Sequence, residues 1–183
     1  VWLAEAGQKE QVVSMVQTLS DFFRASLNSG KDIVSLEGEC RHITSYLQIQ
    51  QVRYQDILTY DVDIPEEIAN CKIPKITLQP LVENALYHGI KNKRGKGRIV
   101  VTGRREKDKC VIRVEDNGIG MTKERLNQVR GGLTTKIEDS NDFYGLYNVN
   151  ERIRLKFGEG YGLSIDSVLQ EGTCVEVWLP WES

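Results

Sequence analysis

Two short segments constrain the fold of this chain more than any other feature. Residues 78–89 carry apolar side chains at the spacing of a buried helix, and Glu83, Asn84 and His88 lie along one side of it. Asn84 and His88 are one helical turn apart, so their side chains share a face. Such a face can hold a metal ion and a phosphate group, although a polar strip on an apolar helix can also be its solvated side.

The second segment, residues 116–120, follows the strand-like run 110–114. It places Asp116 beside Gly118 and Gly120, and glycine lets backbone approach a flat ligand where a Cβ would clash. A carboxylate in such a place can accept a hydrogen bond from an exocyclic amine. Taken alone, the segment also fits an ordinary hairpin turn. The order and spacing of the other motifs must therefore distinguish a turn from a binding pocket.

The order of the motifs favours a pocket. A glycine-rich stretch that ends at residues 144–149 comes next, followed by Gly172-Thr173 before a last strand. This arrangement resembles the ATP-binding domain of the histidine kinases, within the gyrase, Hsp90, histidine kinase and MutL superfamily. Residues 2–7, 19–24 and 46–54 narrow the resemblance to bacterial sensor histidine kinases of the LytS/YesM type, over essentially the whole chain. The P-loop and Rossmann glycine motifs are missing from the sequence.

The acceptor of the phosphoryl group is not recognisable in this sequence. In that family the phosphorylated histidine lies in an Asn-Pro-His-Phe motif upstream of the segment similar to residues 2–4. No such motif occurs here, and neither His42 nor His88 fits it. The resemblance therefore implies a fragment that begins just after the acceptor.

The resemblance implies ATP and Mg²⁺ as ligands and gives several residues a role. Asn84 would be the magnesium ligand, because a neutral oxygen donor suits an ion that takes its other ligands from water and phosphates. His88 would face the phosphates, and Tyr87 stands where many relatives carry a lysine. Asp116 would accept from the adenine amino group, and Thr173 would support Asp116 or the base.

The walls of the pocket follow from the same resemblance. Gly118, Gly120 and Met121 would shape the base site, whereas Gly145 and Leu146 open a helix whose N-terminal amides are a ready anion site. Relatives usually have glycine where this chain has Phe143, and a bulky side chain there is expected to shift the lid away from the phosphates.

Glu83 is the candidate catalytic residue. In related ATPases a carboxylate four residues before the magnesium asparagine activates water, but Pro80 occupies that position here and cannot act as a base. Glu83 could instead take a proton from an incoming imidazole as a general base. The alternative that it only orients a neighbour, or lies in solvent, stays open at this stage.

Composition excludes several classes of protein. No apolar run approaches the roughly 20 residues of a membrane span, and no signal peptide opens the chain. A net charge of −2 gives no general attraction to nucleic acid. The four scattered cysteines favour a reducing cytoplasm and argue against a zinc site. We expect a cytoplasmic domain whose full-length protein is anchored in the bacterial cell membrane through segments upstream of this chain.

Hydrophobic periodicity predicts two units. Residues 1–56 contain two amphipathic helices, the second with Ser35 as its N-cap, and form a helical hairpin that is a remnant of the dimerisation and phosphotransfer region. A second copy could cover its apolar stripes in a homodimeric four-helix bundle, or the neighbouring part of the same chain could cover them. Residues 57–183 predict an α+β fold, a two-layer α/β sandwich of the Bergerat type, with helices on one face of a mixed sheet.

We therefore interpret the chain as the ATP-binding catalytic part of a two-component sensor histidine kinase. By resemblance it would transfer the γ-phosphoryl group of ATP to an upstream histidine, from which a response regulator would take it. Two alternatives stay open. A gyrase-like or chaperone-like ATPase would hydrolyse ATP steadily to drive a clamp, and a non-catalytic dimerisation module would bind no adenine nucleotide.

Overall fold

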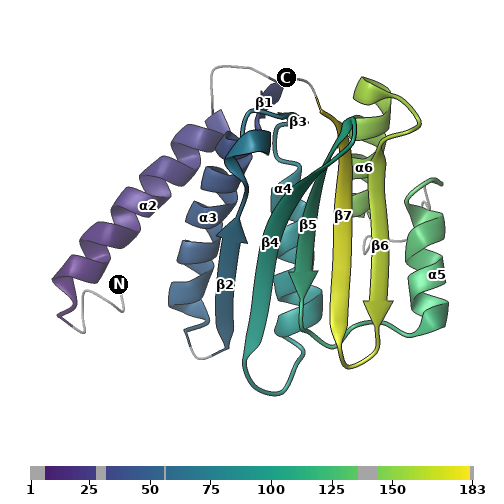
Figure 1. The fold of residues 1–183 in the computed structure, drawn as a ribbon. Coiled ribbons are helices and arrows are strands. Elements are labelled where there is room, and N and C mark those ends of the chain that lie inside the picture. Colours follow the sequence, from purple (N-terminus) through teal and green to yellow (C-terminus); the bar gives the residue numbers. More distant parts are fainter. Residues whose placement is uncertain (1–6, 28–31, 56, 136–143, 182–183) are drawn as a thin grey trace.

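A five-stranded mixed sheet forms the centre of the molecule (Figure 1). The computed structural model describes residues 7–27, 32–55, 57–135 and 144–181. The strands lie in the order β2-β4-β5-β7-β6, and only β2 and β4 run parallel. Their bounds are β2 Leu58–Asp63, β4 Gly97–Glu106, β5 Lys109–Asp116, β6 Gly162–Val168 and β7 Gly172–Pro180.

Helices cover one face of this sheet. α3, α4 and α6 stand behind the strands in the view of Figure 1, α5 lies beside the edge strand β6, and α2 lies outside α3 at the opposite edge. The predicted two-layer α+β architecture with an N-terminal helical hairpin is therefore confirmed. The helices are α2 Lys9–Leu27, α3 Leu36–Arg53, α4 Leu78–Asn84, α5 Lys123–Gly132 and α6 Tyr144–Phe157. None of the helices in the described ranges has the length and apolarity needed to cross a bilayer.

Several short elements escape the sequence analysis. A two-stranded antiparallel ribbon joins β1 (Ile33–Ser35) to β3 (Lys72–Pro74), and a 3₁₀ turn, η2, spans Glu66–Ile68. The helix predicted from residue 76 begins at Leu78 and changes at its C-terminal end into a π-helix, η3 (Ala85–Ile90). The π-helical turn is marked by Lys91 N, which donates to Leu86 O at 2.8 Å. Such turns occur mostly at functional sites.

The alternation of side chains along the strands explains why a single face is covered. In β5, Cys110, Ile112 and Val114 point toward the helices and are buried. The next inward position of this strand is Asp116, so a carboxylate ends an apolar row. The alternation therefore sends Asp116 into the layer between sheet and helices.

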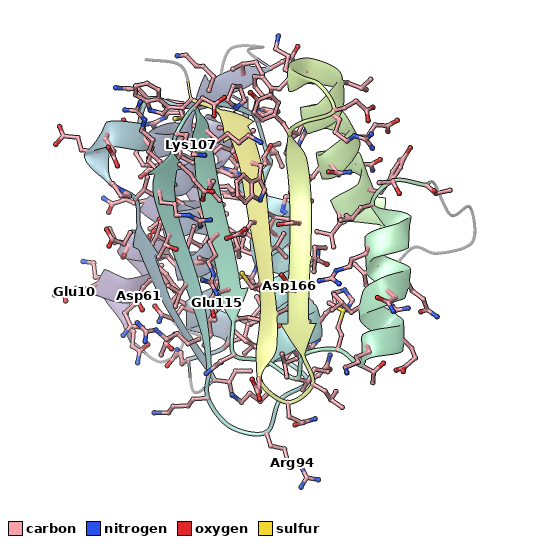
Figure 2. The ribbon with its side chains drawn as sticks, turned by 45° about the vertical axis from the view of Figure 1, so that its right-hand side comes forward. Glu10, Asp61, Arg94, Lys107, Glu115 and Asp166 are labelled. Carbon is pink, nitrogen blue, oxygen red and sulfur yellow. The ribbon has the colours of Figure 1, made fainter. Side chains whose placement is uncertain are left out.

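The other face of the sheet is open and charged. Figure 2 labels Asp61, Glu115 and Asp166 on it, each from a different strand. Ion pairs cross this face, including Arg98 to Asp61 at 2.6 Å and Arg104 to Glu176 at 3.0 Å. Because exposed pairs contribute little free energy, their main effect is to keep this face polar.

Helix α3 belongs to the core of the sheet layer as well as to the hairpin. Its N-cap is Ser35, as predicted, whose Oγ accepts from Gly38 N at 3.2 Å. Leu36, Ile43 and Leu47 are completely buried among core residues. The boundary between two units at residue 57 stays a prediction. The hydrophobic core nevertheless extends across it, because the apolar face of α3 packs against residues 58–179 of the same chain.

Helix α3 also supplies a buried carboxylate to the start of α4. Glu39 is 2% exposed, and its oxygens accept from the backbone amides of Ile76, Thr77 and Leu78 at 2.7, 2.9 and 3.1 Å. These amides are among those that a helix leaves without partners at its N-terminus. Ile76 has φ +56°, a conformation that β-branched residues rarely adopt, so Glu39 helps hold a strained entry into α4.

Candidate functional site

A cavity of about 360 Å³ opens between the sheet and the helices, at the end of the sheet where β5 finishes. It is lined from β5, β6 and β7 on one side and from α4, η3, α5 and the start of α6 on the others. The predicted residues that line it are Asn84, His88, Asp116, Gly120, Met121, Leu146 and Thr173. Four predicted residues, Glu83, Tyr87, Gly118 and Gly145, do not line it.

Asp116 is the buried acceptor of this cavity. Its side chain is 6% exposed, and Oδ1 accepts from Gly118 N at 2.7 Å. Burial raises the pKa of the Asp116 carboxyl from 3.8 to about 6, while bonds from the backbone amides of Gly118 and Thr173 oppose this rise. The carboxylate is therefore ionised at neutral pH and can accept a further hydrogen bond from a ligand.

Glycines make room around this carboxylate. Gly118 does not line the cavity but packs directly against Gly89, so a Cβ on Gly118 would overlap the backbone of Gly89. A Cβ on Gly89 would lie 2.5 Å from Asp116 Oδ1. Gly120 has φ +60°, and a Cβ on it would overlap the carbonyl of Val168. Glycine is thus required here by close approach and by backbone conformation.

Thr173 lies opposite Asp116 in the register of β5 and β7. Its hydroxyl lies 2.9 Å from Ser167 Oγ, which also donates to the carbonyl of Gly172 at 2.8 Å. Ser167 is a residue that sequence reasoning missed, because a partly buried serine near the end of a strand carries no local signal. The pair holds the Thr173 hydroxyl at the cavity wall.

Asn84 and His88 line the opposite wall, as their spacing predicts. Asn84 is the last residue of α4, and His88 lies in the π-helical turn that follows. Asn92, which the sequence analysis missed, donates from Nδ2 to the carbonyls of Tyr87 and His88 at 3.1 and 3.4 Å. The turn that carries His88 is thus stabilised by the two hydrogen bonds from the Asn92 side chain.

The remaining lining residues are mostly apolar and leave a cavity that suits a flat apolar ligand. Sequence reasoning did not assign them to the site, although several were recognised as apolar positions of the predicted helices and strands. They are Leu81, Ala85, Val114, Ile119, Val129, Ile165, Leu169 and Val175, with the polar residues Thr122 and Arg125. Phe143, the residue expected to shift the lid, lies outside the described residues.

Glu83 faces away from the cavity, toward α3. Gln79, one turn earlier, donates from Nε2 to Glu83 Oε1 at 2.9 Å. Tyr46 of α3 lies close by, and its pKa is raised by burial and further by hydrogen bonding to Tyr87 and by the charge of Glu83. Glu83 therefore adjoins Asn84 in sequence but is reached from outside the cavity.

A metal ion at this site would have few protein ligands. Among the described residues, no three His, Cys, Asp or Glu side chains come together in a way that could hold a metal. Asn84 Oδ1 is a neutral oxygen at the cavity wall, which suits Mg²⁺ only if phosphate oxygens and water supply the other ligands. The donor set thus fits a nucleotide-borne magnesium ion.

Family models and relatives decide the assignment. The model of the histidine kinase-, DNA gyrase B-, and HSP90-like ATPases matches residues 74–183, and a histidine kinase model matches residues 1–58. Sensor histidine kinase YesM of Bacillus subtilis is 37% identical over 98% of this chain, and sensor protein LytS of Staphylococcus saprophyticus is 33% identical over 95%. The chain belongs to the sensor histidine kinases of the LytS/YesM type. It spans 29% of the length of each of these two relatives.

Solved histidine kinase structures share the fold. The histidine kinase domain of a blue-light activated kinase from Erythrobacter litoralis has a TM-score of 0.59 and 14% identity, covering 97% of this chain and 82% of that one. The catalytic domain of histidine kinase ThkA has a TM-score of 0.59 and 11% identity, covering 81% of this chain and 94% of that one. These likenesses show the fold, and the family model over residues 74–183 identifies that part of the chain as a histidine kinase-type ATPase domain, which implies ATP binding.

Proposed function

We propose that this chain binds Mg-ATP in the cavity, with adenine against Asp116 and the phosphates toward Asn84, and serves protein-histidine phosphorylation. The observation that carries the proposal is the pairing of a buried, ionised Asp116 with a polar wall of Asn84 and His88 across one cavity. Family membership supports ATP as the ligand, and the positions of Asp116 and Asn84 on opposite walls support the orientation of its base and phosphates. Gly120 and Thr173 adjoin the adenine end, and Leu146 marks the start of α6.

The acceptor histidine would come from outside the residues of this chain. His42 is 3% exposed and donates from Nε2 to Gln79, so it cannot reach a nucleotide in the cavity. His88 lines the cavity as part of the π-helical turn, and we assign it to the phosphates of the nucleotide rather than to the acceptor. Both positions favour an acceptor on another segment, as the resemblance implies.

The proposed transfer uses Glu83 as the base. The acceptor imidazole attacks the γ-phosphorus with one nitrogen, the bond to the β,γ-bridging oxygen breaks, and ADP leaves with that electron pair. The proton on the other imidazole nitrogen passes to Glu83, which adjoins Asn84 in sequence and is half-buried outside the cavity. Mg²⁺ at Asn84 would offset charge on the phosphates.

Homodimerisation through α2 is part of the proposal. Val13, Val16, Leu19 and Phe23 are 49%, 60%, 40% and 53% exposed and follow one stripe of the helix at intervals of three or four residues. Such a stripe on a surface helix is a common interface between two copies. A response regulator would then receive the phosphoryl group, as in two-component signalling.

Isothermal titration calorimetry with ATP and ADP, with and without Mg²⁺, tests the nucleotide site. Asn84→Ala should weaken Mg-ATP binding by about tenfold and leave metal-free ADP binding nearly unchanged, because Asn84 acts through the metal and phosphates. Asn148→Ala, an exposed asparagine on α6, is the matched control. Equal loss with and without Mg²⁺ would contradict the role of Asn84, and steady hydrolysis by this chain would favour the ATPase alternative.

A further inference from the structure

A short chain of hydrogen bonds joins helix α3 to Glu83. His42 Nε2 donates to Gln79 Oε1 at 2.7 Å, and Gln79 Nε2 donates to Glu83 Oε1 at 2.9 Å. His42 is 3% exposed and Gln79 is partly buried, so water competes little for these bonds. The position of the Glu83 carboxylate is therefore tied to a side chain that does not touch the cavity.

The imidazole decides which end of the Gln79 amide meets Glu83. A carboxylate can only accept, so the amide must turn its NH₂ group toward Glu83 and its oxygen toward His42. The proton of His42 must then lie on Nε2. Without that donor, the amide could rotate by a half turn and set its oxygen against the carboxylate, which would push Glu83 away from its place.

Helix α2 contacts the same imidazole. The ring of Phe22 stacks on His42 with centroids 4.7 Å apart and planes 15° from parallel. Phe22 lies on the side of α2 that packs against α3, whereas the exposed stripe with Val16 and Phe23 lies on the other side. A shift of α2 would therefore move the ring that orients Gln79.

We propose that His42 and Gln79 are positioning residues for Glu83, and that Phe22 couples the place of α2 to that carboxylate. The proposal rests on the proposed function of Glu83 as the base for histidine phosphorylation. It adds a route by which the helix bearing the exposed stripe influences phosphoryl transfer without any change in nucleotide binding.

Two substitutions of His42 separate hydrogen bonding from packing. His42→Phe keeps a ring that can stack on Phe22 but removes the donor, whereas His42→Gln keeps a donor near Nε2 and removes the ring. Transfer of ³²P from γ-labelled Mg-ATP to an acceptor histidine is followed in a single turnover, in a protein that contains this full chain and the acceptor. We expect His42→Phe to slow transfer about tenfold, with Mg-ATP affinity within twofold of wild type, and His42→Gln to recover most of the rate.

A double-mutant cycle with Glu83→Gln makes the test specific. If His42 acts through Glu83, then His42→Phe should have almost no further effect on the rate once Glu83→Gln is present. Gln79→Met should behave like His42→Phe, and Gln48→Met, an exposed glutamine on α3, is the matched control. An equal tenfold loss in the Glu83→Gln background, or no loss in the wild-type background, would overturn the proposal.

Two further measurements test the tautomer of His42 and the role of Phe22, and the wild-type protein tests the underlying function. Nitrogen-15 NMR of this chain should place the His42 proton on Nε2, and a proton on Nδ1 alone would overturn the proposal. Phe22→Leu should slow transfer. Phe23→Leu is the control, since Phe23 belongs to the exposed stripe, and it should change the rate only through dimerisation, which is measured in parallel. Absence of transfer by the wild-type protein that still binds Mg-ATP would refute the proposed function rather than this inference.

Discussion

Asp116→Asn separates what the buried carboxylate contributes to ATP binding from what it costs the fold. Burial raises the pKa of Asp116 from 3.8 to about 6, and one pKa unit corresponds to about 1.4 kcal/mol. Between these pH values the folded protein binds the proton more tightly than the unfolded chain does, so the free energy of unfolding falls as pH rises from about 4 to about 6. Above pH 6 the ionised carboxylate destabilises the ligand-free protein by up to about 3 kcal/mol.

Asparagine keeps an oxygen that can accept from Gly118 N but carries no charge. We therefore expect Asp116→Asn to raise the free energy of unfolding by about 1–3 kcal/mol at pH 7.5, with the gain shrinking toward pH 4. The same variant should lose at least about tenfold in affinity for ADP, because its amide can present a donor to the adenine amino group. Stability and binding should thus change in opposite directions.

Urea unfolding between pH 4 and 8 measures the first effect, and calorimetric titration with ADP measures the second. Asp63→Asn is the matched control, since Asp63 is an exposed acid at the end of β2 that does not line the cavity and should show neither effect. A stability difference that does not vary with pH would refute the assignment of a raised pKa to Asp116. Unchanged ADP affinity in Asp116→Asn would remove Asp116 from the binding site.

Three further perturbations test the glycine cluster, the buried cap and the exposed stripe. Gly120→Ala should abolish detectable ADP binding and lower the melting temperature, because a Cβ would overlap Val168, whereas Gly131→Ala, with nothing within 4 Å of the added Cβ, should bind normally. Glu39→Gln should destabilise the protein by about 1–3 kcal/mol in urea unfolding, because a single amide oxygen cannot replace two carboxylate oxygens that accept hydrogen bonds from three backbone amides. An unchanged unfolding midpoint would contradict the capping role of Glu39. Val16→Glu should shift the protein from dimer to monomer in light scattering, while Gln17→Glu on the same helix should not; equal masses for both variants would argue against the stripe as the interface.

Much of the fold was predictable from local patterns. Alternation over residues 57–64 and 110–115 predicted β2 and β5, and the three-four spacing after Ser35 predicted α3 with its N-cap. The ribbon of β1 and β3 was missed because three-residue strands carry too few positions for a period to show. The π-helical end of the asparagine helix was missed for a related reason, since α and π turns share the same apolar residues.

The candidate site was predictable where its residues belong to short motifs. Asn84 with His88, and Asp116 with Gly120, were predicted from spacing and resemblance, and both pairs line the cavity. Tyr87, Gly118 and Gly145 were predicted as nucleotide-binding residues but do not line the cavity described here, so their direct contact with nucleotide stays a prediction.

By itself the sequence determined the longer helices and strands, the glycines of the pocket motif and the polar residues Asn84, His88 and Asp116, because each depends on neighbours within a few positions along the chain. Only the tertiary structure decided that α3 enters the core, that Glu39 holds the start of α4, and that Glu83 faces α3 rather than the nucleotide. The physical reason is distance along the chain. Glu39 and His42 meet partners 37–39 residues away, and which side chains meet over such a separation depends on how whole helices pack, which no local period encodes.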